Sequence, residues 1–482
     1  MGEERYDVVI IGAGVSGCAV ARELARYDAR VCVVERADDV CCGTSKANSA
    51  IVHAGFDAQP GTLMAKLNVE GNRLLHEMAS ELNFALVPCG SLVVCNDEEA
   101  RPALEALRER GVTNGVEGLR IVEREELREM EPNVVDEAVC ALWAPTGAIV
   151  DPFGLNVALA ENAATNGVDF VFNAEVTGLA RDDEGWTILT TAGEMHSRVV
   201  VNAAGVYADE LHNMVANDRM RIVARKGEYL LLDTTAFGHV RHTVFMLPTK
   251  MGKGVLVSPT VHGNVIVGPT ATDVENKEGV DTTSAGLAEV ASKCALTVRD
   301  VPLGEVITSF AGLRAHDERH DFFIGEVPGA PGFVDCAAIE SPGLTSCPAI
   351  GRMVAGIVRD MLGLAEKPAG AFTSTRPGVV NLVMTSLEDW NKLVAEDPAY
   401  GHVVCRCCRV SEAQIVDVLH RPVPARSIDA IKRRTGCTMG RCQGGFCTPK
   451  IMAIMERELG MAPEEVTKSG PGSELLVSKD GE

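Results

Sequence analysis

Six of the sixteen cysteines lie in one short stretch near the end of the printed sequence. Cys405 and Cys407 form a C-x-C pair, and Cys442 and Cys447 form a C-x4-C pair about 35 residues later. Four thiolates on two loops, with predicted helices at 411–420 and 427–434 to hold those loops, are typical of a metal site. Zinc sites usually use cysteine pairs two to four residues apart, so zinc fits this spacing less well.

A second group of residues could hold a dinucleotide. Gly12, Gly14 and Gly17 follow an apolar run at 6–11 and precede a helical pattern at 18–27, and a second apolar run ends at Glu35. The first glycine permits a tight turn, the second lets the backbone approach a pyrophosphate, and the third lets the helix pack on the strand. The helix N-terminus offers N–H groups to phosphates, and the carboxylate accepts ribose hydroxyls. This order predicts a βαβ unit that binds a dinucleotide.

The segment that follows favours FAD over NAD. Residues 42–49 are small and polar and run into an apolar, glycine-containing segment at 51–55. Hydroxyl and N–H groups in such a segment can contact the phosphates and ring of a flavin bound in an extended form. A small-residue turn at 202–205 closes another predicted strand, where it can back the cofactor.

Together, the 12–17 turn with Glu35, the segment at 49–55, the turn at 202–205 and the segment at 343–346 resemble the D-amino-acid oxidase/glycerol-3-phosphate dehydrogenase superfamily of FAD enzymes. The resemblance covers about residues 5–362. Its nearest branch contains glycerol-3-phosphate dehydrogenases and oxidases and the L-2-hydroxyglutarate oxidases. It implies an α/β fold, with a Rossmann-like FAD-binding domain interleaved with an antiparallel-sheet substrate domain. The predicted cofactor-binding residues are Gly12, Gly14, Gly17, Glu35, Thr44, Ser45, Asn48, Ser49, Val176, Ala204, Gly205, Gly343, Leu344 and Thr345.

His53 and Arg314 are the candidate catalytic residues. The family places the segment around His53 beside the flavin ring, and a histidine with a pKa near neutrality suits removal of a hydroxyl proton. The alternative is a structural histidine in a turn. Arg314 follows an apolar strand pattern, and its guanidinium can bind a carboxylate or a phosphate with two hydrogen bonds.

Other cations could complete an anion pocket. Lys250, Lys253 and His262 are further substrate-binding candidates, and their alternative is a solvated hairpin. Arg225 and Lys226 are weaker candidates.

Residues 403–455, with the two cysteine pairs, a glycine-rich loop and the segment at 431–435, resemble the [2Fe-2S] domain of the bacterioferritin-associated-ferredoxin type. Such domains are often found at the C-terminal end of flavin dehydrogenases. The resemblance implies that Cys405, Cys407, Cys442 and Cys447 are the ligands. Cys408 and Cys437 are extra thiols, which we expect to be spare, and the alternative is that they substitute as ligands. Zinc or a metal-free domain are the alternatives.

The sequence predicts four parts along the chain. We expect an FAD-dependent oxidoreductase unit at 1–365, a linker at 366–402, a [2Fe-2S]-binding domain at 403–457 and a tail at 458–482. Within the first unit, we expect FAD-binding parts at about 1–80, 150–215 and 305–365. Substrate-binding parts are expected at about 81–149 and 216–304, where a period of two at 221–270 indicates an antiparallel sheet.

Charge and hydropathy exclude some partners. The net charge of −22 argues against nucleic acid, because a phosphate backbone needs a basic surface. No apolar run approaches the roughly 20 residues of a membrane span. The first apolar run enters a glycine turn, so it is a strand and not a secretory signal. We expect a cytoplasmic protein, or one peripheral to the inner face of a membrane through a partner.

The resemblance implies a dehydrogenase that oxidises sn-glycerol 3-phosphate to dihydroxyacetone phosphate. Electrons are expected to pass through FAD and the [2Fe-2S] cluster to a partner protein, either another flavoprotein or a membrane-linked carrier. L-2-hydroxyglutarate is the alternative substrate, because the same cations bind a carboxylate. Two hypotheses of other classes are a non-catalytic electron-transfer subunit and a scaffold or iron-handling protein.

Overall fold

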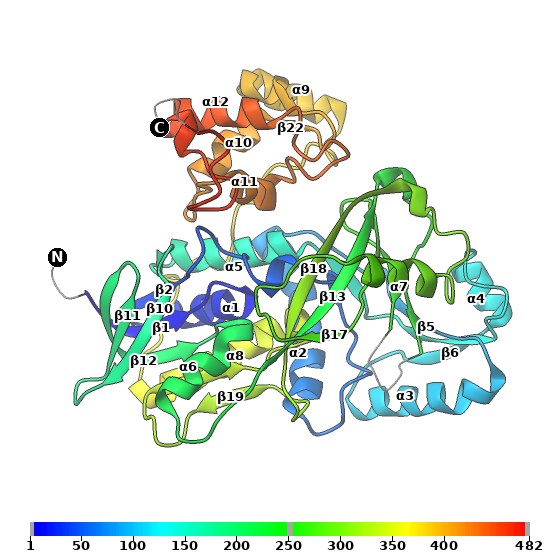
Figure 1. Cartoon of the computed structure of the whole chain (residues 1–482), viewed down its shortest axis with the longest axis horizontal. Helices are drawn as coiled ribbons and strands as arrows, with labels where there is room; N and C mark the ends of the chain where they lie inside the picture. The colour runs from blue at the N-terminus through cyan, green and yellow to red at the C-terminus, as the bar shows by residue number, and fades with distance from the viewer. Residues whose placement is uncertain (1–3, 248–253, 478–482) are drawn as a thin grey trace.

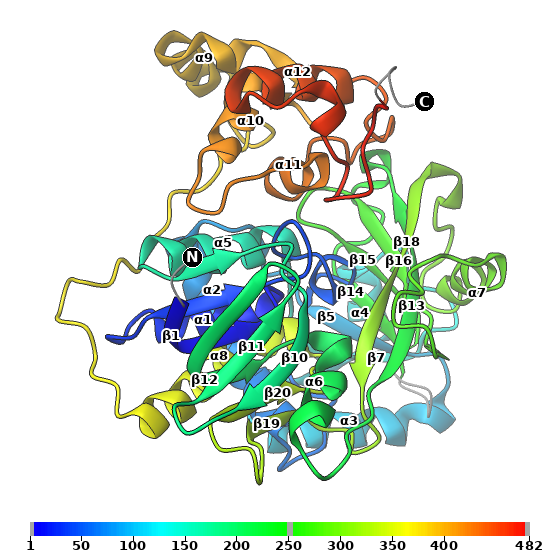
Figure 2. The same cartoon turned by 60° about the vertical axis from the view of Figure 1, so that its left-hand side comes forward.

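The protein has a large unit built on two main sheets and a smaller, mostly helical C-terminal domain (Figure 1). The computed structural model describes residues 4–247 and 254–477. The small domain lies against one side of the large unit, and both views show a long extended segment leading to it (Figure 2). This arrangement confirms the predicted mixed α/β fold with a small helical domain.

The first sheet carries the glycine-rich turn. In the described part of the chain it has eight strands, in the order β10-β11-β12-β1-β2-β9, with β20 beside β12 and β19 beside β20. Strands β12, β1, β2 and β9 run parallel, as expected for a βαβ unit. Their bounds are β1 (Glu4–Ile11), β2 (Val31–Val34), β9 (Asp169–Val171), β10 (Val176–Arg181), β11 (Trp186–Thr190), β12 (Gly193–Asn202), β19 (Phe323–Glu326) and β20 (Phe333–Ala337).

The central strands of this sheet are buried on both faces, and helices cover one of these faces. Val8, Val9 and Ile10 of β1 have no exposed surface, which explains the continuous apolar run there. A Cβ on Gly351 would lie 2.7 Å from the carbonyl oxygen of Ala19, so this glycine permits the close contact between α1 and α8. The helices in contact here are α1 (Val15–Leu24), α2 (Leu63–Leu82), α5 (Pro152–Thr165) and α8 (Gly343–Leu362).

The second sheet is mainly antiparallel. Across the described ranges it has nine strands, in the order β17-β13-β16-β15-β14-β5-β7-β6, with β18 beside β13. Its one parallel pair there, β14 with β5, joins the two predicted substrate-binding segments. The bounds are β5 (Ser91–Cys95), β6 (Arg120–Glu123), β7 (Cys140–Ala144), β13 (Val223–Leu232), β14 (Thr243–Met246), β15 (Leu256–Pro259), β16 (Val265–Gly268), β17 (Thr272–Val274) and β18 (Val306–His316).

Short elements complete the large unit. A small sheet of β3 (Ile51–Val52), β8 (Ala148–Val150) and β4 (Leu86–Val87) holds the segment that carries His53. The remaining helices are α3 (Arg101–Thr113), α4 (Arg124–Met130), α6 (Ala208–Val215) and α7 (Ser284–Cys294). No helix in the described ranges is long and apolar enough to span a membrane.

The C-terminal domain has its own apolar core. Ile415, Val418, Ile431 and Ile451 are fully buried in it. The predicted helices at 411–420 and 427–434 correspond to α10 (Glu412–Leu419) and α11 (Ile428–Thr435). The other elements are α9 (Leu387–Glu396), β21 (Val403–Cys405), β22 (Val410–Ser411) and α12 (Thr448–Leu459).

Three predicted boundaries differ from the structure. Strand β18, which was expected in an FAD-binding part, pairs along its length with β13 of the second sheet. The predicted linker contains α9, and Leu382 within it is 2% exposed. Part of the predicted tail is packed, since Val466 is fully buried and Thr467 accepts a hydrogen bond from the backbone N–H of Ile428. These contacts are tertiary, so local composition did not predict them.

Candidate functional site

The glycine-rich turn has the geometry that a bound diphosphate needs. Gly12 has φ +106°, and a Cβ there would lie 2.5 Å from the carbonyl oxygen of Ala203. A Cβ on Gly17 would lie 2.0 Å from the carbonyl oxygen of Gly12, so the helix can approach the turn only with glycine at this position. Helix α1 begins after Gly14 without a side-chain cap, which leaves N–H groups at its positive end to bind an anion.

Glu35 lies at the end of β2, beside this turn. Its carboxylate oxygens accept hydrogen bonds from the backbone N–H groups of Ala13 at 2.7 Å and Ala37 at 2.9 Å. Burial raises the pKa of Glu35, and these two N–H groups oppose that rise. The carboxylate is therefore fixed where an acid of a dinucleotide site accepts ribose hydroxyls.

The polar loop at 42–49 crosses the N-terminus of α1. Ser45 Oγ accepts a hydrogen bond from the N–H of Val15 at 2.9 Å, so a hydroxyl occupies the start of the helix. Thr44 Oγ1 donates to the carbonyl of Leu313 in β18 at 2.6 Å, which ties the loop to the second sheet. Asn48 bonds to the carbonyl oxygens of Thr44 and Ser45, so its side chain shapes the loop.

A cavity of about 1590 Å³ runs between the two sheets. Ligand sites for drug-sized molecules measure roughly 300–1,000 Å³, so this cavity has room for a dinucleotide and a small substrate together. Gly17 and Thr345 are not in its lining, because Gly17 packs within the turn and Thr345 is buried behind the wall. The predicted residues that line it are Gly12, Gly14, Glu35, Thr44, Ser45, Asn48, Ser49, His53, Val176, Ala204, Gly205, Arg225, His262, Arg314, Gly343 and Leu344.

The backbone of His53 is held on both sides. Its N–H donates to Thr345 Oγ1 at 2.9 Å, and its carbonyl accepts from the side-chain amides of Asn68 at 2.8 Å and Asn72 at 3.1 Å. Its ring lies 5.9 Å from the ring of Phe245, between centroids. The imidazole is thus presented to the cavity from a fixed segment.

The candidate cations differ in their charge partners. No carboxylate of the described residues forms an ion pair with Arg314, whose Nη atoms lie 3.4 and 3.5 Å from the carbonyl oxygen of Thr270. Arg225, directly opposite in the strand register, is bound by Asp273 at 2.6 and 3.0 Å. Lys226 is buried and donates to the carbonyl of Asp281. Of these three cations, Arg314 is therefore the one that no carboxylate of the described residues neutralises.

Of the remaining substrate-binding candidates, the structure describes only His262. His262 lies on the cavity wall, with Nε2 3.8 Å from a carboxylate oxygen of Asp151. Burial lowers the pKa of His262, but the hydrogen bond and charge of Asp151 outweigh it, so the pKa is raised. Lys250 and Lys253 lie outside the described residues.

The six clustered cysteines converge in the small domain. The Sγ atoms of Cys405, Cys437 and Cys447 all lie within 4.8 Å of one another, and Cys407 Sγ lies 3.8 Å from Cys442 Sγ. Hydrogen bonds from the thiols of Cys408 and Cys437 lower the pKa of Cys405 to about 2. A thiolate among convergent sulfurs is the donor set that an iron–sulfur cluster uses.

Cys437 was expected to be a spare thiol, with a ligand role as the alternative. The structure places it in the buried group of three, next to Cys405 and Cys447. The spacing of Cys437 from the other cysteines in the sequence does not predict that it lies next to Cys405 and Cys447.

The sequence matches the family described as FAD dependent oxidoreductase over residues 7–357. The chain belongs to this FAD-dependent oxidoreductase family. Residues 403–457 match the BFD-like [2Fe-2S] binding domain. The predicted recognition and cofactors, FAD and a [2Fe-2S] cluster, are therefore confirmed, and the glycine turn, Glu35 and the convergent thiols fit these groups.

The chain is also similar to individual proteins of known activity. The oxidoreductase is 45% identical over 472 residues to a glycerol 3-phosphate dehydrogenase of Caloramator mitchellensis, covering 98% of each chain. The solved L-alpha-glycerophosphate oxidase of Mycoplasma pneumoniae, with FAD bound, is 34% identical with a TM-score of 0.73 over 77% of this chain and 98% of its own. The human mitochondrial L-2-hydroxyglutarate dehydrogenase is 31% identical over 57% of this chain and 62% of its own.

Sequence reasoning missed several residues of the cavity. His320 and Glu340 line it, and together with His316 they form a group whose ligand atoms lie within 4.8 Å of one another. The C-terminal domain also contributes to the lining, with Asp429, Lys432, Arg433, Met439 and Gln443. No local signal marks these five, because only the packing of the two units brings them to the cavity.

Proposed function

We propose that this oxidoreductase oxidises sn-glycerol 3-phosphate to dihydroxyacetone phosphate and delivers the electrons through its [2Fe-2S] cluster to a partner protein. The observation that carries the proposal is Arg314, which lines the cavity and has no carboxylate partner among the described residues. A guanidinium in this position suits a phosphate, which it can bind with two parallel hydrogen bonds. The full-length relationship to a glycerol 3-phosphate dehydrogenase supports the same substrate.

In the proposed reaction, the secondary alcohol loses one hydride from carbon and one proton from its hydroxyl group. FAD, when bound, supplies the acceptor for the hydride. His53 takes the hydroxyl proton, and its fixed backbone keeps the imidazole in one place during the transfer. Arg314 holds the phosphate, so the carbon that reacts is presented in one orientation.

The cysteine loop supports a dehydrogenase over an oxygen-dependent oxidase. Met439 and Gln443 line the same cavity as His53, and Gln443 directly follows Cys442 in the sequence. The proposed cluster is therefore next to the flavin cavity. A [2Fe-2S] cluster, when bound, carries single electrons and gives them a route out of the site.

The proposed partner contacts the exposed side of the cysteine loops. Cys407 is exposed there, and Phe446, one residue before Cys447, is 82% exposed. Arg406 and Arg409 flank Cys407 and are exposed, and no ion pair involves them in the described residues. A basic surface with an apolar residue fits a redox protein, such as another flavoprotein, with an acidic contact surface.

The proposed location is the cytoplasm, with any membrane contact made through that partner. All sixteen cysteines are free thiols in the structure, although six of them lie close together. This pattern is typical of a reducing compartment.

An anaerobic titration tests the substrate. Addition of glycerol 3-phosphate should bleach the flavin absorption, and L-2-hydroxyglutarate should bleach it far more slowly. The second candidate substrate has support from the L-2-hydroxyglutarate dehydrogenase relatives and from the ability of Arg314 to bind a carboxylate. Faster bleaching by L-2-hydroxyglutarate would replace the first proposal with the second. Bleaching by neither, with reduction by a partner, would show a non-catalytic electron-transfer subunit.

A further inference from the structure

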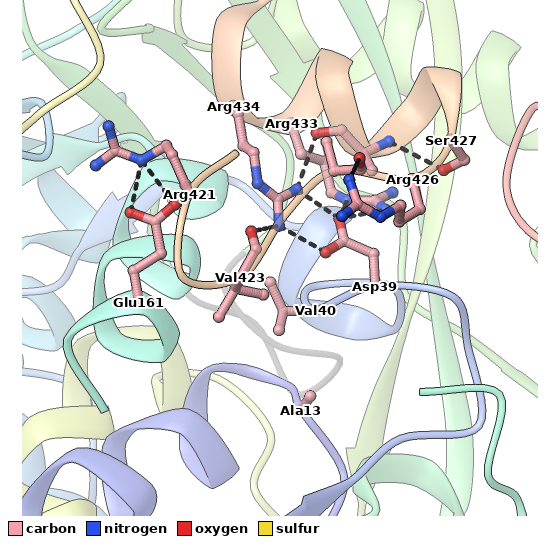
Figure 3. A network of polar contacts seen from close by, with 12 residues as sticks. Ala13, Asp39, Val40, Glu161, Arg421, Val423, Arg426, Ser427, Arg433 and Arg434 are labelled. Atoms are coloured by element: carbon pink, nitrogen blue, oxygen red, sulfur yellow. Dashed lines mark hydrogen bonds and ion pairs between the residues drawn. The ribbon is translucent and has the colours of Figure 1, made fainter. Parts of the chain in front are cut away.

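A buried ionic contact joins the small domain to the loop that follows Glu35. Asp39 accepts two hydrogen bonds from Arg433, at 2.8 and 3.0 Å, and two from Arg434, both at 2.7 Å (Figure 3). All three side chains are at most 4% exposed. The two guanidinium groups hold the pKa of Asp39 below its usual range in spite of its burial. The charge on this carboxylate is therefore balanced by the other domain.

A second contact fixes the same interface at α5. Glu161, which has no exposed side-chain surface, bonds to Arg421 at 2.9 Å (Figure 3). It also bonds to Arg376, in the segment that leads to the small domain, at 2.5 Å. Breaking a buried ion pair leaves an uncompensated charge in the interior, so such contacts hold two surfaces in one arrangement. The small domain is thus docked on two elements of the dinucleotide-binding unit.

Docking brings α11 to the edge of the FAD cavity. Lys432 lines the cavity together with Glu35, Ser45 and Lys46. The Lys432 side chain is 31% exposed, and its amine lies 3.9 Å from a carboxylate oxygen of Asp429.

The cations of Lys468, Arg433 and Lys46 lie near Lys432, and Asp429 is its ion-pair partner at 3.9 Å. Burial and the nearby charges of Lys468, Arg433 and Lys46 lower the pKa of Lys432, and Asp429 compensates only in part. Cations gathered at a cavity wall repel one another, and an anion bound between them removes that repulsion. Lys46 directly follows Ser45, whose hydroxyl meets the N-terminus of α1 where a diphosphate binds.

We propose that the iron–sulfur domain completes the FAD site, with Lys432 of α11 binding the diphosphate of the cofactor. The Asp39 and Glu161 contacts hold the domain in the position that this requires. FAD affinity then depends on a residue outside the family segment at 7–357. The Mycoplasma oxidase holds FAD in a chain that aligns with 77% of this one, so the proposed contact strengthens FAD binding to the oxidoreductase unit and is not its sole source.

The test compares two lysines that share one neighbour. Lys432→Gln removes the proposed contact, and Lys468→Gln removes a charge that is 56% exposed, bonds to Asp429 at 2.8 Å and lies outside the cavity lining. Each full-length, cluster-loaded protein is freed of flavin and titrated with FAD, with ADP and with adenosine. The visible spectrum of the cluster checks that the small domain is intact.

We expect Lys432→Gln to weaken FAD and ADP binding about tenfold or more, which is the loss of one charge-assisted hydrogen bond. Adenosine, which has no phosphate, should bind all variants alike, and Lys468→Gln should match the wild type. Equal affinities for FAD in the two variants would overturn the proposal. So would an equal loss of ADP and adenosine binding in Lys432→Gln, because that result indicates a disturbed fold.

A measurement on the wild-type protein needs no substitution. Amine acetylation followed by mass spectrometry compares Lys432 with Lys468 in the absence and presence of ADP. ADP should slow the acetylation of Lys432 several-fold and leave Lys468 unchanged. Equal rates for Lys432 with and without ADP would contradict direct contact with the diphosphate.

Discussion

Arg314→Gln should remove most of the substrate affinity of the enzyme. The guanidinium has only long contacts to the carbonyl of Thr270, so the substitution costs few contacts within the protein. Hydrogen bonds to charged groups contribute about 1.5–3 kcal/mol each, and a partly exposed pair lies at the lower end. Two such bonds to a phosphate amount to about 3 kcal/mol, so kcat/KM for glycerol 3-phosphate should fall on the order of 100-fold.

Arg225→Gln is the matched control for this substitution. Arg225 faces Arg314 across the β13–β18 pair and carries the same charge, but Asp273 neutralises it. The assay measures kcat/KM anaerobically with a small artificial electron acceptor, and flavin content is checked by absorbance. Arg225 also lines the cavity, but we expect Arg225→Gln to stay within about threefold of wild type, since Asp273 already neutralises its charge. An equal loss in both variants, or no loss in Arg314→Gln, would refute the assignment of the phosphate site.

Three further variants test the other assignments. His53→Gln should lower kcat by about 100-fold or more with FAD still bound, and an unchanged kcat would remove His53 from the proton transfer. Glu35 has a raised pKa, so the wild type should lose FAD affinity as the pH falls through that pKa and the carboxylate is protonated. The Glu35→Gln variant should bind FAD more weakly, and its FAD affinity should not fall further at acid pH, as measured by flavin fluorescence. Arg406→Gln with Arg409→Gln should lower the rate with an acidic protein acceptor about tenfold at low salt and leave a neutral dye unaffected, whereas equal effects would argue against docking there.

The parts of the site that are contiguous in sequence could be predicted from it. The turn from Gly12 to Gly17 and the acid at Glu35 belong to one βαβ unit, whose spacing follows from local geometry. The C-x-C and C-x4-C pairs likewise lie on two short loops. In both cases the residue types and their spacing in the sequence determine which side chains lie close together.

The parts that depend on packing between distant segments could not be predicted. Strand β18 belongs to the second sheet because it pairs with β13, and no local pattern identifies a strand partner. The difference between Arg314 and Arg225 depends on the position of Asp273 across the sheet. Lys432 reaches the FAD cavity only because Asp39 binds α11, which is a contact between two domains.

We propose that electrons from a bound alcohol pass from the flavin to the cluster. The most direct test is electron paramagnetic resonance of the protein after anaerobic addition of glycerol 3-phosphate. We predict bleached flavin together with the signal of a reduced [2Fe-2S] cluster, and the Cys442→Ser variant should show bleached flavin without that signal. Bleached flavin with an intact but fully oxidised cluster in the wild type would contradict this electron route.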